Sequence, residues 1–179
     1  MNIPNLLTLL RIVLVPVIVI FLIQGSFCKA LVFFTVSGIT DALDGFFSRV
    51  LKQQTALGAH LDPVADKALL ASCFLTLSIL GIIPGWVTVI VISRDFIILL
   101  GISVMFMMSV SFEIRPAFVS KLTTAAQLAT VLIVLAHQCL SGKFDDVWVT
   151  RFYWLTAVLT VISGFNYIVR GLKFVNHDT

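Results

Sequence analysis

Six long apolar stretches dominate this chain of 179 residues. An α-helix needs roughly 20 consecutive apolar residues to cross the hydrocarbon core of a bilayer, and most of these stretches approach or reach that length. Hydrophobic residues make up 59% of the chain and charged residues only 12%, which excludes an ordinary soluble domain. We therefore expect one all-α integral membrane domain over residues 1–179, with six transmembrane helices at residues 6–23, 30–47, 69–83, 86–110, 117–140 and 147–172.

The positions of the basic residues predict an orientation in the membrane. Six spans place both termini on the same side. The helix ends and loops of that side contain Arg49, Lys52, Arg115, Lys121, Arg170 and Lys173, whereas the other side contains Lys29, Lys143 and Arg151. Because basic residues are enriched in cytoplasmic segments, we expect both termini in the cytoplasm.

Two classes of site are not indicated by the composition. The basic residues are scattered along the chain, so the net charge of +3 does not predict nucleic-acid binding. The three cysteines, Cys28, Cys73 and Cys139, are widely spaced and form no C-x-x-C pair. Their spacing predicts neither a disulfide framework nor a zinc site.

Four of the nine acidic residues fall in one short segment, at Asp41, Asp44, Asp62 and Asp66. The first two are three residues apart near the cytoplasmic end of the second span, and the last two are four apart near the start of the third, so each pair shares a helix face. Carboxylates that converge from two helices repel unless cations, protons or strong donors neutralise them. Carboxylate oxygens suit Mg²⁺ or Mn²⁺. The alternative is that these are interfacial acids neutralised by neighbouring basic residues such as Arg49 and Lys67.

The same aspartates belong to a longer pattern of fixed spacing. In order, it consists of Asp41, two residues, Asp44-Gly45, two residues, Ser48-Arg49, eight residues, Gly58, three residues, Asp62, three residues and Asp66. This pattern closely resembles the signature of the CDP-alcohol phosphotransferase family, D-x2-D-G-x2-A-R-x8-G-x3-D-x3-D. Its one departure is Ser48 in place of alanine, a small-for-small change. The six-span layout extends the resemblance to nearly the whole chain.

The resemblance implies an enzyme with its active site in a polar cavity at the cytoplasmic side. In this family an alcohol attacks a cytidine diphosphate lipid at the phosphorus that bears the lipid, and CMP leaves. By similarity, Asp41, Asp44, Asp62 and Asp66 bind Mg²⁺ or Mn²⁺, as a pair of ions. Asp66 also serves as the general base for the alcohol.

The remaining motif residues are implied to bind CDP-diacylglycerol. Gly45 and Gly58 would let the nucleotide approach the backbone closely, and Arg49 would hold its diphosphate. Each also has an ordinary structural explanation, as a helix-packing glycine, a turn glycine and an interfacial arginine.

A second set of polar residues opens the chain. Asn5, Thr8 and Arg11 recur every three residues after Pro4, so they share one face of the first helix. This opening looks like that of family members that make phosphatidylglycerophosphate or cardiolipin, which implies that Asn5 and Thr8 contact the CDP-lipid. The alternative is helix capping by Asn5 and an interfacial Arg11.

The acceptor site is expected among basic residues of the fourth and fifth spans. Arg94 stands near the middle of the fourth span beside Asp95, where charge is costly. The segment Ser120–Gln127 resembles one that contributes a lysine to an anion pocket in phosphatidylglycerol-forming members. The resemblance implies that Arg94, Lys121 and Arg115 bind the phosphate of the acceptor. The alternatives are a structural Arg94–Asp95 ion pair and an interfacial Lys121.

A phosphate pocket predicts a phosphate-bearing alcohol as the acceptor. Glycerol 3-phosphate and the headgroup of phosphatidylglycerol both qualify. The tripeptide Ser93-Arg94-Asp95 looks like cardiolipin synthases, but the compact chain looks bacterial, and phosphatidylglycerophosphate synthesis is the family's commonest bacterial activity. We place glycerol 3-phosphate first, for an enzyme of the bacterial inner membrane. Membrane lipids are further partners, and a homodimer is left open.

Two functions of other classes are alternatives to an enzyme. The aspartates of a cation-coupled carrier would form an ion site, with Arg94 as a counter-charge for the substrate. A carrier explains the buried charges but not Gly45, Arg49 and Gly58 at their spacings. A lipid-embedded scaffold without chemistry leaves the acidic residues unexplained. Release of CMP that depends on an added alcohol distinguishes the enzyme from both.

Overall fold

The computed structural model describes residues 3–51, 56–107, 118–140 and 146–175. The predicted all-helical character is confirmed in these residues, and the second and third helices are longer than their apolar stretches. Apolar residues mark the lipid-facing part of a helix, whereas its backbone hydrogen bonds continue through polar residues beyond that part. The helices are α1 (Ile3–Ile23), α2 (Phe27–Leu51), α3 (Ala56–Ile79), α4 (Gly85–Met107), α5 (Phe118–Cys139) and α6 (Asp146–Val175).

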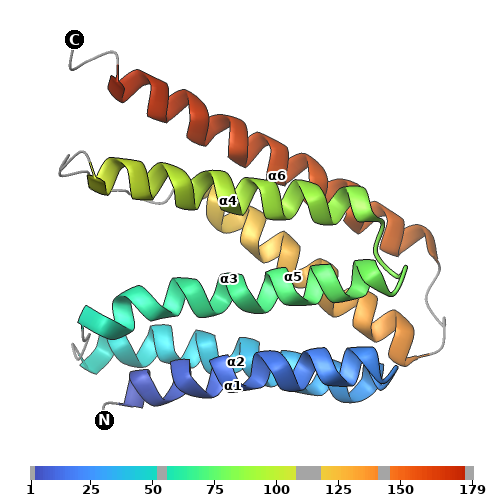
Figure 1. Ribbon diagram of the computed structural model, residues 1–179. Helices are drawn as coiled ribbons and strands as arrows, with labels where there is room; N and C mark the ends of the chain where they lie inside the picture. Colours follow the sequence, from blue (N-terminus) through green and yellow to red (C-terminus); the bar gives the residue numbers. More distant parts are fainter. Residues whose placement is uncertain (1–2, 52–55, 108–117, 141–145, 176–179) are drawn as a thin grey trace.

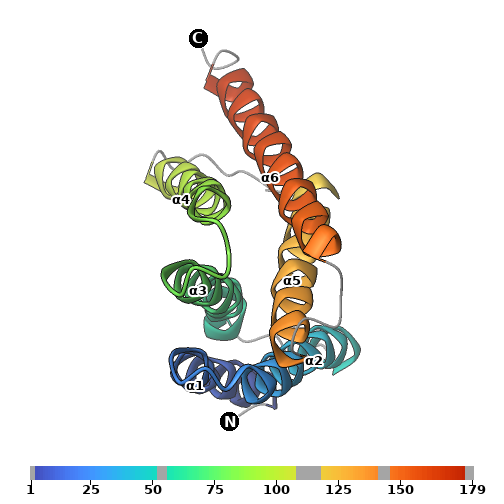
Figure 2. The same ribbon diagram turned by 90° about the vertical axis from the view of Figure 1, so that its right-hand side faces the viewer.

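The six helices contact one another in a closed ring, in the order α1, α3, α4, α6, α5, α2 and back to α1. Figure 2 shows this ring along the helices, and α3 also contacts α5 across it. Helices α1 to α4 run alongside one another, while α5 and α6 are tilted against them (Figure 1). The ring places α1 against both α2 and α3, the two helices that carry the aspartate motif.

The two ends of the bundle differ in what they carry. Both chain termini lie at one end, which we call the terminal end (Figure 1). The opposite end, here the turn end, carries the tight turns after α1 and α3. Each turn contains a glycine with positive φ, Gly25 at 69° and Gly81 at 71°, a conformation that other residues rarely adopt. The amides of these glycines donate to the carbonyls of Leu22 and Ser78, which ends each helix.

The surface of the bundle is largely apolar, and polar residues are buried beside an apolar core. Large apolar side chains such as Val13, Ile79 and Phe165 are exposed, whereas Thr123, Gln127 and several other polar residues are buried. The apolar surface is consistent with a membrane protein. Two of the described segments are long and apolar enough to cross a bilayer, Val119–Cys139 and Asp146–Tyr167.

Hydroxyl and amide groups join α5 to α6. The Thr130 and Thr156 hydroxyls are 2.6 Å apart, and the Gln127 amide donates to the Thr160 hydroxyl at 3.3 Å. The Thr123 hydroxyl shares its hydrogen between the carbonyl of Val119, on α5 itself, and that of Leu159 on α6. Such contacts suit helices in lipid, where small polar side chains allow close approach and have no water as a competing partner.

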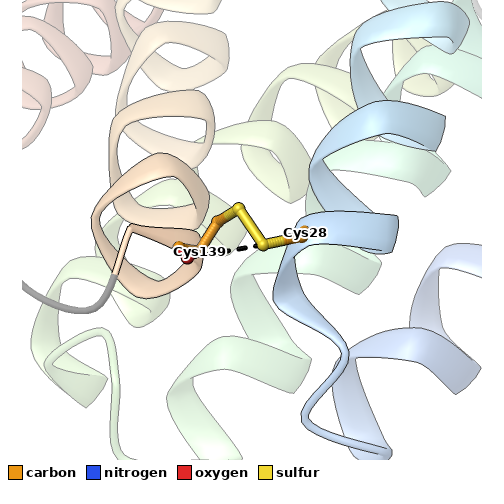
Figure 3. The surroundings of a disulfide bond; sticks show 2 residues. All are labelled: Cys28 and Cys139. Atoms are coloured by element: carbon orange, nitrogen blue, oxygen red, sulfur yellow. Dashed lines mark hydrogen bonds between the residues drawn. A yellow bond between two sulfur atoms is a disulfide. The ribbon is translucent and has the colours of Figure 1, made fainter.

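A disulfide joins Cys28 to Cys139, although the cysteine spacing predicted no disulfide framework. It connects the first turn of α2 to the last residue of α5 at the turn end (Figure 3), with the Cα atoms 4.7 Å apart. The two cysteines are 111 positions apart in sequence, so their proximity follows from the packing of α2 on α5 and could not be derived from spacing. The third cysteine, Cys73, is a buried thiol.

Candidate active site

The aspartate motif lies on α2 and α3, toward the terminal end. Asp41 and Asp44 fall in the second half of α2, and Asp62 and Asp66 in the first half of α3. The side chain of Asp66 is described, but those of residues 41–64 are not. The predicted metal ligands Asp41, Asp44 and Asp62 and the predicted CDP-lipid contacts Gly45, Arg49 and Gly58 therefore lie outside the described side chains, and their roles stay predictions.

Asp66 forms an ion pair with Arg11. The guanidinium Nη1 of Arg11, on α1, contacts Oδ1 of the Asp66 carboxylate on α3. The Arg11 side chain is fully buried, whereas that of Asp66 is 39% exposed, so the carboxylate is held on one side and open on another. The sequence had placed Arg11 on one face with Asn5 and Thr8, whose side chains are not described. It did not identify Asp66 as its partner, although an arginine in an apolar helix implies a nearby anion.

The next residue along α3 reaches in another direction. Lys67 Nζ donates to Oδ1 of Asp95 on α4 at 2.8 Å. Residues adjacent in a helix point about 100° apart, since 3.6 residues complete a turn. One turn of α3 therefore contacts α1 through the carboxylate of Asp66 and α4 through the ammonium group of Lys67.

Arg94 is held on three sides by polar groups. Its Nη1 donates to Asp95 Oδ1 at 2.6 Å, and its Nη2 donates to the hydroxyls of Ser120 on α5, at 2.6 Å, and Ser163 on α6, at 2.9 Å. The side chain is 5% exposed, and its Nε has no hydrogen-bond partner among the residues that the structure describes. The Arg94–Asp95 ion pair that the sequence offered as an alternative is present.

Lys121 lies at the same junction of helices. It follows Ser120, which accepts from Arg94, and its side chain is exposed. The structure thus links Arg94 to the residue that precedes Lys121, and the anion pocket shared by the two cations stays a prediction. The third predicted member of that pocket, Arg115, lies outside the described residues.

Comparison of the sequence with known proteins gives the family. The family model for CDP-alcohol phosphatidyltransferase matches residues 1–162. The chain belongs to this family. The resemblance found in the aspartate motif is thereby confirmed over most of the sequence.

Relatives within the CDP-alcohol phosphatidyltransferase family carry two kinds of name. A probable phosphatidylglycerophosphate synthase of Mycobacterium tuberculosis is 36% identical over 180 residues, which cover 96% of this chain and 82% of that protein. A CDP-diacylglycerol–glycerol-3-phosphate 3-phosphatidyltransferase of Bacillus subtilis is 28% identical, with 95% of each chain covered. The CMP-forming cardiolipin synthase of Rattus norvegicus is 32% identical over 97% of this chain, which spans 63% of the length of that relative.

The described part of the site contains a partly exposed carboxylate and a cluster with two cations and one anion. Arg11 fixes the position of the Asp66 carboxylate, and Arg94, Asp95 and Lys67 form a charged cluster between α3 and α4. No group of three potential metal ligands occurs among the described side chains, which include only one of the four motif aspartates. The oxygen chemistry of the four aspartates and the partial exposure of Asp66 fit a hard divalent cation.

Proposed function

We propose that this protein transfers the phosphatidyl group of CDP-diacylglycerol to glycerol 3-phosphate, giving phosphatidylglycerophosphate and CMP. The observation that carries the choice of acceptor is the buried Arg94, which is bonded to Ser120 beside the exposed Lys121. A guanidinium on α4 and an ammonium group on α5, on helices joined by the Arg94–Ser120 hydrogen bond, suit a small phosphate monoester. Arg115 is assigned to the same phosphate on the resemblance alone.

The reaction exchanges one phosphorus–oxygen bond for another. A hydroxyl oxygen of glycerol 3-phosphate attacks the phosphorus that bears the diacylglycerol, and the bond from this phosphorus to the bridging oxygen of CDP breaks. CMP leaves with the bridging oxygen, and Asp66 takes the hydroxyl proton. Arg11 keeps the Asp66 carboxylate directed toward the reacting hydroxyl through the ion pair between α1 and α3.

The donor side of the site rests on the family motif. We assign Arg49 to the diphosphate, Gly45 and Gly58 to close backbone approach by the nucleotide, and Asn5 and Thr8 to its other contacts. Two Mg²⁺ or Mn²⁺ ions held by Asp41, Asp44, Asp62 and Asp66 would neutralise the charge of the diphosphate.

The proposed topology has six transmembrane helices and both termini in the cytoplasm, in a bacterial inner membrane. The disulfide at the turn end supports this orientation, because disulfides persist outside the reducing cytosol. Aromatic residues support a membrane interface at the turn end: the rings of Trp86 and Trp154 are 5.0 Å apart, and Arg151 lies over Trp148. Tryptophans of this kind are typical of membrane interfaces. The motif aspartates then open to the cytoplasm, where water-soluble glycerol 3-phosphate is available.

The names of the bacterial relatives favour glycerol 3-phosphate over phosphatidylglycerol. The Mycobacterium tuberculosis relative, 36% identical, is named a probable phosphatidylglycerophosphate synthase, and those of Bacillus subtilis and Aquifex aeolicus are named for glycerol 3-phosphate. The identity to that cardiolipin synthase, 32%, keeps phosphatidylglycerol as the second candidate acceptor.

Measurement of CMP release tests both candidates. Purified protein is supplied with CDP-diacylglycerol, Mg²⁺ or Mn²⁺, and either glycerol 3-phosphate or phosphatidylglycerol, and the lipid product is identified by mass. We expect CMP release with glycerol 3-phosphate, formation of phosphatidylglycerophosphate, and none of either in Asp66→Asn. Activity with phosphatidylglycerol alone would replace the first acceptor by the second. No CMP release with any alcohol would overturn the enzyme and favour a carrier or a scaffold.

A further inference from the structure

One carboxylate oxygen serves two cations between α3 and α4. Asp95 Oδ1 accepts from Lys67 Nζ at 2.8 Å and from Arg94 Nη1 at 2.6 Å. All three side chains are largely withdrawn from solvent, with exposures of 13% for Asp95, 26% for Lys67 and 5% for Arg94. Two positive charges and one negative charge leave this cluster with a net charge of about +1, which is costly in a membrane interior. An anionic ligand would lower that cost.

The cluster lies where the two halves of the proposed reaction meet. Lys67 adjoins the proposed base Asp66 in sequence, and Arg94 adjoins the proposed acceptor cation Lys121 through Ser120. Asp95 therefore connects α3, which carries the proposed base, to Arg94, which we propose to bind the acceptor phosphate.

A second contact between α3 and α4 offers a comparison. The Thr88 hydroxyl of α4 donates to the Phe74 carbonyl of α3 at 3.3 Å. Thr88 is buried and lies in the first turn of α4, toward the turn end and away from the motif aspartates. Loss of this hydrogen bond weakens the same pair of helices without touching the charged cluster.

We propose that Asp95 is a positioning residue for the transfer reaction. It holds Lys67 and Arg94 at fixed places, so that the acceptor phosphate bound beside Arg94 presents its hydroxyl to Asp66. This inference rests on the proposed function. A positioning residue differs from a purely structural ion pair in its effect on the two substrates. Loss of a positioning Asp95 changes acceptor binding and alignment more than it changes binding of CDP-diacylglycerol.

The test compares four variants with the wild-type protein. Asp95→Asn removes the charge and keeps the shape, whereas Asp95→Glu keeps the charge at a slightly different reach. Lys67→Met/Asp95→Asn removes one cation together with the anion, which restores the net charge of the cluster should the single variant fold poorly. Thr88→Val is the matched control for the contact between α3 and α4.

The measurements are kcat, KM for each substrate, the thermal midpoint, and the shift of that midpoint on adding glycerol 3-phosphate without metal.

In Asp95→Asn we expect KM for glycerol 3-phosphate to rise about tenfold or more, the order of a lost charged contact. We expect kcat to fall about 10- to 100-fold from misalignment, with KM for CDP-diacylglycerol within about twofold of its starting value, on the order of experimental spread. Asp95→Glu should recover part of both losses. The double variant should be no worse than Asp95→Asn, because both act through the same contact. Glycerol 3-phosphate should raise the thermal midpoint of the wild type but not that of Asp95→Asn.

Two results in the Asp95 variants would overturn the inference alone. One is an equal change in KM for both substrates. The other is a lower thermal midpoint with unchanged kinetics, as expected for Thr88→Val. A wild-type protein that uses only phosphatidylglycerol would overturn the proposed acceptor. The role of Asp95 then requires that Asp95→Asn raises KM for phosphatidylglycerol more than KM for CDP-diacylglycerol. A wild-type protein without CMP release would overturn the proposed function itself and this inference with it.

Discussion

Arg11 and Asp66 are joined across the interface of α1 and α3, with the guanidinium fully buried and the carboxylate partly exposed. The first helix therefore contributes directly to the site that the aspartate motif defines. A buried arginine is stable in an apolar environment only beside an anion, and the base that we propose at Asp66 needs its rotamer fixed. The same ion pair meets both needs.

Replacement of Arg11 should therefore damage both stability and catalysis. In Arg11→Met we expect a loss of about 1–3 kcal/mol in stability, because a charge-assisted contact is removed. We also expect kcat to fall by about tenfold or more, since the base is no longer oriented. Arg11→Lys should be intermediate, because an ammonium group keeps the charge but not the planar fork. Thermal midpoints and CMP release measure the two effects.

The matched control for Arg11 is Arg151→Met. Arg151 lies at the turn end, with its guanidinium 5.2 Å from the ring centre of Trp148, and is exposed. Its loss should leave kcat unchanged. Equal losses of kcat in the two arginine variants would show that Arg11 has no particular relation to the base.

Asp66→Asn should abolish transfer in a folded protein. The amide keeps the size of the side chain but cannot take up the proton of the attacking hydroxyl. General bases contribute about 100- to 10,000-fold, so activity should drop by at least about 100-fold. CMP release and a size-exclusion profile are the measurements, and full activity in the variant would contradict the role of Asp66 as the base.

Loss of a motif aspartate on α2 should change the metal requirement. In Asp41→Asn or Asp44→Asn we expect the Mg²⁺ concentration for half-maximal activity to rise about 10- to 100-fold, because a carboxylate ligand is lost. Asp146→Asn, at an exposed position at the turn end, is the control. An unchanged metal titration in the α2 variants would remove these two residues from the metal site.

The sequence predicted the helices well and their partners less completely. Six apolar stretches gave six helices, because burial in lipid dictates long apolar runs. The stretches gave no information on the order of the helices around the ring, in which α1 lies against both α2 and α3. Packing order depends on the shapes of side chains, which hydropathy does not record.

The same distinction applies to the site. The motif located Asp66 on α3 because its chemistry needs fixed spacings along helices. The partners of charged residues were harder to derive: Arg94 was given Asp95 as one possible partner, but Lys67, which shares Asp95, was considered only as a neighbour of the aspartates. Contacts between residues 28 and 55 positions apart, as for Lys67 with Asp95 and Arg11 with Asp66, are set by tertiary packing.

The acceptor pocket predicts unequal effects on the two substrates. Lys121→Ala should remove a charged contact worth about 1.5–3 kcal/mol, equivalent to a 10- to 150-fold loss in apparent affinity for glycerol 3-phosphate. The KM for CDP-diacylglycerol should change much less. Arg94→Lys should be damaging too, because the single nitrogen of lysine cannot replace both Nη1, which binds Asp95, and Nη2, which binds Ser120 and Ser163. Lys29→Ala, a change of equal charge at the turn end, is the control.

A double variant separates the two explanations of Arg94. If Arg94 only balances Asp95, neutralising both should restore stability and leave acceptor kinetics nearly intact. A persistent rise in KM for the acceptor in the double variant supports the pocket. Equal losses for both substrates, or none, in Lys121→Ala and Arg94→Lys would contradict it.

The disulfide predicts a protein whose stability, but not whose chemistry, depends on redox conditions. Cys28→Ser should lower stability by about 2–4 kcal/mol, because the Cys28–Cys139 link constrains a long stretch of the unfolded chain. Its location at the turn end, away from Asp66, predicts unchanged kcat at temperatures where the variant is folded. Cys73→Ala removes the free thiol and keeps the disulfide. A reductant should therefore lower the thermal midpoint of the wild type and of Cys73→Ala, but not that of Cys28→Ser. In intact cells, Cys139 of a Cys28→Ser/Cys73→Ala variant should react with a membrane-impermeant maleimide, and labelling only after lysis would reverse the proposed orientation.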